Sequence, residues 1–186
     1  MNPELKAICN QIAWLERYCY ELDCISQQPI PELSSEGFEN ACRIAPHFIN
    51  MLRGLLTDAI YLGIARLLDK DVQGQHQNLC MKRILATHPN QRALTTKLDK
   101  ADTLFANGHC ARNKLLAHAD LNSVLEYPDS AYSMSIDIPT FGKIIFKLRE
   151  IVLCFPENTL PLHPCCQNDW LGVATILDNL RRSAQK

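Results

Sequence analysis

Residues 111–120, Ala-Arg-Asn-Lys-Leu-Leu-Ala-His-Ala-Asp, carry the side chains of this chain that are best suited to chemistry on a phosphodiester. We call them the signature segment. Arg112 is a permanent cation whose planar fork of donors fits phosphate oxygens. His118 supplies an imidazole, the side chain type that gives or takes a proton near neutrality. The combination predicts half of a nuclease site.

Three further residues of the signature segment are candidates for support. Asn113 carries amide donors and an acceptor that could orient Arg112 or RNA, and Lys114 shares a helix face with His118 and could contact phosphate. Asp120 could fix the tautomer of the imidazole, or it could be only a solvated residue or turn former at a helix end. Both interpretations of Asp120 remain open at this point.

The two principal residues also have structural interpretations. A histidine near the C-terminus of a helix can be present for packing, or because its cation interacts favourably with the helix dipole. Arg112 and Lys114 would often be no more than a solvated face of a helix whose other side is buried through Leu115 and Leu116. Residue types alone do not choose between these interpretations and catalysis.

The order of these residues resembles a known family. Arg112-Asn113 followed five residues later by His118 resembles the Arg-polar-x4-His motif of the HEPN superfamily, and Arg-Asn-Lys-x-x-Ala-His-x-Asp resembles its AbiU2-like branch. Upstream, the stretch DAIYLGIARLLDK resembles the second helix of that branch. The resemblance covers about residues 40–155 and rests in that stretch on Asp58, Arg66, Leu67 and Asp69.

The resemblance implies an RNA-cleaving homodimer without a cofactor. Arg112 and His118 lie six residues apart and point roughly 120° away from each other on an ideal helix, so either the helix is distorted or two subunits build one cleft. The resemblance implies the second arrangement. His118 would then act as general base or acid on a ribose 2′-OH, and Arg112 would stabilise the charge that develops on the phosphorane. DNA, which lacks the 2′-hydroxyl, would not be cut.

The biological role implied by the resemblance is a toxin-like or phage-defence effector, with an antitoxin protein as a further partner. In some HEPN toxins a tyrosine two residues after the histidine is modified by a partner enzyme. Asp120 occupies that position here, which argues against silencing by that route. The competing interpretation is a catalytically silent helical module that binds RNA or a protein through the same residues.

Asp58, Arg66 and Asp69 have two interpretations of their own. Asp58 and Arg66 lie eight residues apart, which brings them to nearly the same helix face. A buried ion-pair network is the structural interpretation and the one we prefer. The alternative is that one of them holds the polar groups of the signature segment in place without touching substrate.

The chain as a whole is consistent with one helical domain over residues 1–186. It has 186 residues with 19 basic and 20 acidic side chains, so any RNA binding must come from a local patch. No signal sequence and no apolar segment of membrane-spanning length are expected, which favours a cytoplasmic protein. The nine cysteines are expected to be reduced thiols, because they are odd in number, the chain is not short, and many sit at helical core spacing rather than in loops. We expect no metal, because the adjacent thiols of Cys165-Cys166 suit one tetrahedral ion poorly.

Apolar periodicity predicts an all-α fold, a HEPN-like helical bundle. Helices are expected over about 3–26, 36–68 with a possible kink at Pro46, 79–86 and 91–105, the last ending at Asn107-Gly108. The helix of the signature segment should begin near His109, and a long loop over 119–135 should follow it. A further helix is expected from Asp137 to Pro156, and 157–186 should form a tail with a short helix over 169–182.

Three details of this prediction concern packing. The stripe Leu5 to Leu22 is nearly a heptad and is expected to be core rather than a dimer seam. Residues 69–77 should be a polar loop, and only 132–136 alternates like a strand. The second helix is expected to bury Phe38, Cys42, Phe48, Leu52, Leu55, Ala59, Leu62 and Leu67.

Overall fold

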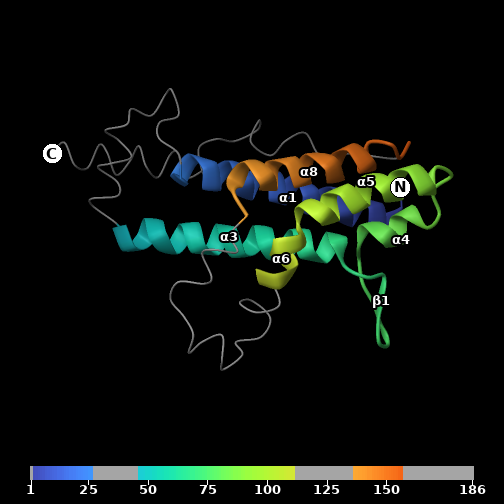
Figure 1. Cartoon of the computed structure of the whole chain (residues 1–186), viewed down its shortest axis with the longest axis horizontal. Helices are drawn as coiled ribbons and strands as arrows, with labels where there is room; N and C mark the ends of the chain where they lie inside the picture. Colours follow the sequence, from blue (N-terminus) through green and yellow to red (C-terminus); the bar gives the residue numbers. More distant parts are fainter. Residues whose placement is uncertain (1, 27–45, 112–135, 157–186) are drawn as a thin grey trace.

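The structure is a computed structural model that describes residues 2–26, 46–111 and 136–156. Within these ranges the chain forms helices and one small hairpin, which confirms the all-α prediction. The long helices lie side by side with similar axes (Figure 1). The helices are α1 (Pro3–Ser26), α3 (Pro46–Leu68), α4 (Met81–Leu85), α5 (Gln91–Leu104), α6 (Ala106–Ala111) and α8 (Ile138–Val152).

Helix α1 forms as predicted and supplies one wall of the core. Its apolar stripe recurs every three or four residues, and four turns of it are almost completely inaccessible to solvent. Cys19 is half-buried on the same side. Because the stripe packs against other helices of the same chain, it is core, as predicted, and not a dimer seam. The buried residues of the stripe are Leu5, Ile8, Ile12, Leu15 and Leu22.

Helix α3 forms, but its buried face differs from the predicted one. Phe48 and Leu55 were expected inside and are exposed, whereas Ile49 is buried. The reason is that α3 is apolar nearly all round, so periodicity alone does not choose a face. The part predicted before Pro46 lies outside the described residues, and α3 is described from Pro46 onwards. Its buried residues include Ile60, Tyr61, Ile64, Ala65, Leu67 and Leu68.

The same helix contradicts the expectation that no apolar segment reaches membrane-spanning length. His47–Leu68 is 22 residues long with a mean hydropathy of 1.3, which suffices by length and composition. Only 33% of that window is buried. Its last turns are nevertheless part of the helical core, as in many core helices, so the length of α3 does not by itself assign the chain to a membrane.

The segment after α3 is a hairpin rather than the predicted loop. Val72–Gln73 (β1) pairs antiparallel with His76–Gln77 (β2), and Gly74 turns the chain with a φ of 63° that favours glycine. The backbone N–H of Asn78 donates to the carbonyl of Asp71 at 2.8 Å and closes the base. Two-residue strands carry almost no periodic signal, which is why the sequence did not reveal them.

The predicted break at Asn107-Gly108 is wrong by two residues. Helix α5 ends at Leu104, Phe105 caps it, and α6 already begins at Ala106. Gly108 is therefore inside α6 instead of ending a helix. Its α-carbon lies against the Phe105 ring, and a β-carbon there would overlap that ring. The glycine serves close packing, so it does not act as a breaker.

Helix α8 begins and packs as predicted. The carboxylate of Asp137 accepts a hydrogen bond from the Thr140 N–H at 2.7 Å, and Pro139 occupies the first turn. All six predicted apolar positions are buried against α1 and α5. These positions are Phe141, Ile144, Ile145, Leu148, Ile151 and Val152.

Three other predicted features lie outside the described residues. They are the loop over 119–135, all but Ile136 of the possible strand over 132–136, and the tail helix over 169–182.

Candidate functional site around the signature segment

The five site residues predicted in the signature segment lie outside the described residues. The structure describes the chain up to Ala111 and again from Ile136, so it shows the two ends from which residues 112–135 are held. The geometry of those ends is the structural information that bears on the site. The five residues are Arg112, Asn113, Lys114, His118 and Asp120.

The first end is α6, which is fixed by packing on α5 and α3. The backbone of Phe105 turns the chain between α5 and α6, with its N–H shared among carbonyls of the last turn of α5. The Phe105 ring is fully buried and lies against Gly108 on one side and against Tyr61 of α3 on another, with ring centroids 6.0 Å apart. The residue preceding Arg112 therefore belongs to a helix that is packed on the bundle.

A polar pair joins α6 to α5. Nε2 of His109 donates to Oδ1 of Asp102 over 2.7 Å, and the imidazole stands edge-on to the Phe105 ring at 5.0 Å. Both side chains are partly exposed, at 33% for His109 and 42% for Asp102. The pair fixes the ring of a histidine three residues before Arg112 in the chain. Helical periodicity gives no signal for this pair, because Asp102 and His109 lie in two different helices that the turn at Phe105 brings together.

The second end is Ile136, which is fastened to Tyr61. The backbone N–H of Ile136 donates to the Tyr61 hydroxyl at 2.7 Å. Burial raises the pKa of Tyr61, and the hydrogen bond with Ile136 partly opposes that rise, so the hydroxyl remains neutral. One residue later, Asp137 caps α8, and its hydrogen bonds to Thr140 hold the pKa of the Asp137 carboxyl below its ordinary value. Residues 136 and 137 are thus held at a fixed point of the bundle.

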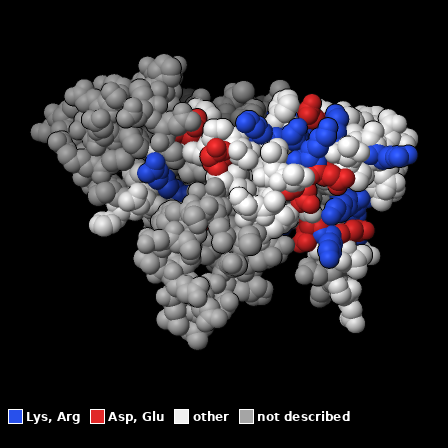
Figure 2. All heavy atoms as spheres, in the orientation of Figure 1, with Lys and Arg blue, Asp and Glu red and all other residues white. Residues whose placement is uncertain are grey.

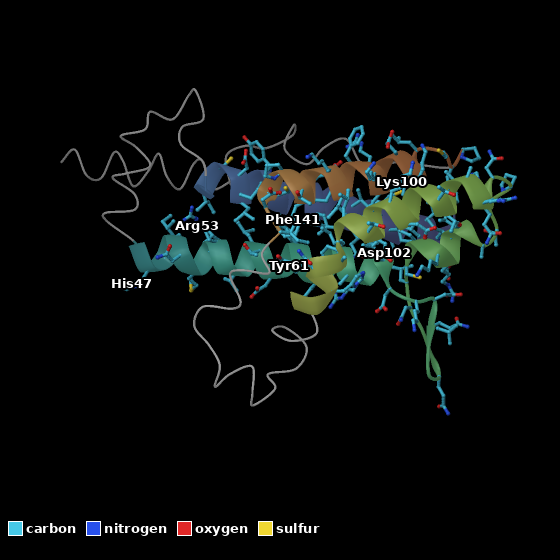
Figure 3. The ribbon with its side chains drawn as sticks, in the orientation of Figure 1. His47, Arg53, Tyr61, Lys100, Asp102 and Phe141 are labelled. Carbon is cyan, nitrogen blue, oxygen red and sulfur yellow. The ribbon has the colours of Figure 1, made fainter. Side chains whose placement is uncertain are left out.

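Tyr61, Phe105 and Phe141 form what we call the aromatic cluster. Phe141 stands edge-on to Tyr61 with ring centroids 5.0 Å apart, while Phe105 is tilted against the other side of Tyr61. Figure 3 shows Tyr61 and Phe141 next to one another between α3 and α8. Because Phe105 leads into α6 and Tyr61 binds Ile136, both ends of the segment 112–135 are held at this one cluster.

The residues predicted to form a buried ion-pair network do not form one in the structure. Asp58 and Arg66 are both exposed, and among the described residues no ion pair joins them. Two helical turns separate them by about 12 Å along the axis, too far for a direct pair. Asp69 is half-buried at the end of α3, where its carboxylate accepts from the Lys70 N–H at 2.9 Å. The expectation of a buried network over Asp58, Arg66 and Asp69 is therefore wrong.

A groove of about 420 Å³ lies between α1 and α8, and the sequence did not predict it. Glu16 and Asp23 bring carboxylates to it, and Tyr20 and Phe146 line its apolar part. Arg149 donates two hydrogen bonds to the Glu16 carboxylate there, at 2.8 and 2.9 Å. Burial and the nearby Asp23 raise the pKa of Cys19 to about 11, so this thiol is a poor nucleophile.

No protein-family model, curated protein or solved structure matches this chain. Over the described ranges, histidine, cysteine and carboxylate side chains do not gather in a group of three that could hold a metal ion. The described cysteines Cys9, Cys19, Cys24, Cys80 and Cys154 form no disulfide.

Proposed function

We propose that this protein is a metal-independent endoribonuclease of HEPN type, in which Arg112 and His118 act on RNA. The observation that carries the proposal is the signature Arg-Asn-Lys-x-x-Ala-His-x-Asp in an all-helical chain. A supporting observation is that the aromatic cluster holds both ends of residues 112–135. Such anchoring fixes the positions of the two chain ends between which Arg112 and His118 lie in the sequence.

The proposed reaction is a transesterification within the RNA strand. His118 takes the proton of a ribose 2′-OH, and the 2′ oxygen attacks the adjacent phosphorus. Arg112 stabilises the additional negative charge on the phosphoryl oxygens while the bond to the 5′ oxygen breaks. The products are a 2′,3′-cyclic phosphate and a 5′-hydroxyl, and the leaving oxygen receives a proton. DNA lacks the 2′-hydroxyl and is not a substrate.

The proposed active form is a homodimer in the cytoplasm, since one ideal helix does not aim Arg112 and His118 at one phosphate. In this form each cleft takes Arg112 from one protomer and His118 from its partner. Asn113, Lys114 and Asp120 orient the RNA or the catalytic groups. The biological role we propose is that of a toxin-like or phage-defence effector, restrained by an antitoxin protein.

The experiment is cleavage of a labelled mixed-sequence RNA in the presence of EDTA. Wild type is compared with Arg112→Ala, His118→Ala and two controls, Arg92→Ala and His47→Ala, whose side chains are exposed on other helices. We expect wild type and controls to leave cyclic phosphate ends and the two signature variants to lose at least about a hundredfold in rate. Equal cutting by all five proteins would remove Arg112 and His118 from the active site.

Mixing the two inactive variants tests the composite cleft. If each cleft takes Arg112 and His118 from different protomers, a mixed dimer regains one intact cleft of its two. Half of the dimers are mixed at equilibrium, so activity should recover to about a quarter of the wild-type value. Clefts built within one protomer would show no recovery. RNA binding without cleavage by wild type would favour the silent helical module instead.

A further inference from the structure

We propose that four lysines on α5 and α8 form a binding surface for the phosphates of single-stranded RNA. We call Lys97, Lys100, Lys143 and Lys147 the lysine stripe. The choice of RNA as the polyanion rests on the proposed function, whereas the stripe itself rests on the arrangement of the two helices. Figure 2 shows several basic side chains over this part of the molecule, with acidic side chains beside them.

On α5, the lysines and the aspartates lie on different sides of the buried residues. Lys97 and Lys100 each come one residue before a buried position, Leu98 and Ala101. The carboxylates Asp99 and Asp102 each come one residue after those same positions. Since one residue turns a helix by about 100°, the lysines share one flank of α5 and the aspartates share the other. Figure 3 shows Lys100 at the border with α8 and Asp102 on the side of α6.

On α8, Lys143 and Lys147 occupy the flank that faces α5. They also come one residue before buried positions, whereas Arg149 follows one and reaches across to Glu16 of α1. The flank opposite Arg149 therefore lies away from α1, and α8 packs there against α5. The two helices run in opposite directions (Figure 1), so the residues that precede buried positions lie on the flanks of α5 and α8 that face each other. All four lysines lie along this boundary between the two helices.

The stripe has no acidic partner in the described part of the chain. None of its four lysines forms an ion pair among residues 2–26, 46–111 and 136–156. Lys143 only helps to lower the pKa of Asp137, as the smallest of the causes. Glu150 follows Lys147 by three residues and lies on the same side of α8 as Lys143, but it forms no ion pair with either lysine in these ranges. The groove between α1 and α8 instead presents Glu16 and Asp23, so phosphates favour the α5 side.

An exposed aromatic ring on α8 distinguishes single-stranded nucleic acid from other polyanions. Phe146 is 61% exposed, more than any other large apolar side chain in the described ranges. It lies one helical turn from Lys143 on the outer side of α8, and it also lines the groove between α1 and α8. A ring beside lysines provides a stacking surface for an unpaired base while the lysines contact phosphates. An acidic peptide has no such need for a flat apolar partner.

The test measures equilibrium binding of a fluorescent mixed-sequence RNA of roughly 20 nucleotides, longer than the site of one binding domain. The full chain is used with EDTA at several salt concentrations, with a 2′-O-methylated RNA so that cleavage cannot occur. The stripe variant changes all four lysines to Gln, and the matched control changes Lys6, Lys70, Lys82 and Arg92 to Gln. Both variants carry a net charge of −1 − 4 = −5, so they differ only in where the charge is lost.

We expect the stripe variant to bind at least about tenfold more weakly than wild type at low salt. The slope of log affinity against log salt should fall by up to about 2.8, since each lost phosphate contact contributes about 0.7 for a single strand. Changing the four lysines to Arg should preserve the slope. The control variant should stay within about threefold of wild type, and Phe146→Ala should weaken binding roughly five- to hundredfold.

Three outcomes would overturn the stripe. They are no RNA binding by wild type at low salt, equal weakening in the stripe and control variants, and stripe-dependent binding to phosphatidylserine vesicles but not to RNA. Binding through the stripe without any cleavage of unmodified RNA would keep the stripe and remove the nuclease. Unchanged RNA binding and unchanged cleavage in the stripe variant would keep the nuclease and remove the stripe.

Discussion

Two aromatic contacts hold opposite ends of α8, and they differ in what they fasten. At its start, the aromatic cluster of Tyr61, Phe105 and Phe141 joins three helices and receives the Ile136 N–H. At its end, His88 stands edge-on to Phe155 at 4.5 Å. We call His88 with its partners the histidine contact. About 22 Å of helix separates the two, so changes at one end need not disturb the other.

The histidine contact closes a turn, whereas the aromatic cluster holds the segment that carries the proposed active site. Nδ1 of His88 accepts from the Asn90 N–H at 3.0 Å, which leaves Nε2 as the donor to the Cys154 carbonyl at 3.3 Å. These bonds fasten the connection between α4 and α5 to the chain just after α8. Similar aromatic packing therefore has two roles in this protein: the histidine contact serves stability alone, whereas the aromatic cluster serves stability and the positioning of a segment. Variants at the two ends separate these roles.

The largest effect is expected from Phe141→Ala in the aromatic cluster. The side chain is almost fully buried and packs against Tyr61, so truncation leaves a cavity and should lower the free energy of unfolding by about 3–5 kcal/mol. Urea denaturation measures this loss. Its control is Phe146→Ala, which removes an exposed ring of the same helix and should cost far less. Equal losses would mean that the aromatic cluster does not stabilise the bundle.

Gly108→Ala is expected to be the next most damaging change at the same end. The new β-carbon would overlap the Phe105 ring, so α6 or the ring must shift, at a cost of about 1–3 kcal/mol. The matched control is Gly54→Ala, where nothing lies within 4 Å of the added carbon. That change should stabilise α3 by about 0.5–1 kcal/mol. Thermal unfolding of both variants should therefore shift in opposite directions, and shifts of the same sign would contradict the packing argument.

The sequence predicted some elements of the fold closely and misplaced others. Helices α1 and α8 were predicted closely because each has a one-sided apolar stripe, and Asp137 with Pro139 marks the start of α8. The break near Gly108 was misplaced because glycine marks both a helix end and a close contact, and the Phe105 ring decides between them. The face of α3 was misassigned because an all-round apolar helix has no preferred side.

The candidate site was also predicted only in part. Arg112 and His118 were visible as residue types at a spacing, which is local information. The aromatic cluster was not, because Tyr61, Phe105 and Phe141 come from distant parts of the chain and meet only through tertiary packing. The lysine stripe likewise depends on the opposite directions of α5 and α8 (Figure 1). Periodicity within one helix gives the flank on which each lysine lies, but not which helix that flank faces.

His88→Ala tests the other side of the comparison. Removing the ring leaves the Asn90 N–H and the Cys154 carbonyl without their partner and exposes one face of Phe155, so the free energy of unfolding should fall by about 1–3 kcal/mol. RNA binding and cleavage per folded molecule should stay unchanged. A specific loss of cleavage in a folded His88→Ala protein would show that the two ends are coupled.

Tyr61→Phe removes only the hydroxyl and is expected to act on position more than on stability. The packing against Phe105 and Phe141 is kept, but the Ile136 N–H loses its acceptor, at a cost of about 0.5–1.5 kcal/mol. Because Ile136 ends the segment that carries Arg112 and His118, we expect cleavage to fall by more than RNA binding does. Comparing the cleavage rate at saturating RNA with the binding affinity separates the two. Unchanged cleavage would make this hydrogen bond purely structural.

The smallest expected effect is a loss of stability in acid through Asp137. Hydrogen bonds to Thr140 hold the pKa of this carboxyl in the folded chain below the ordinary value of 3.8. A lowered pKa in the folded state means that the stabilisation is fully present above pH 3.8 and is lost as the pH falls through the lower folded value. Asp137→Asn keeps a capping side chain but cannot ionise, so its unfolding free energy should depend less on pH below about 4 than that of wild type. Identical acid profiles for the two proteins would mean that the cap at the start of α8 acts through its geometry alone, and the link between Ile136 and Tyr61 would then account for the fixed position of this end.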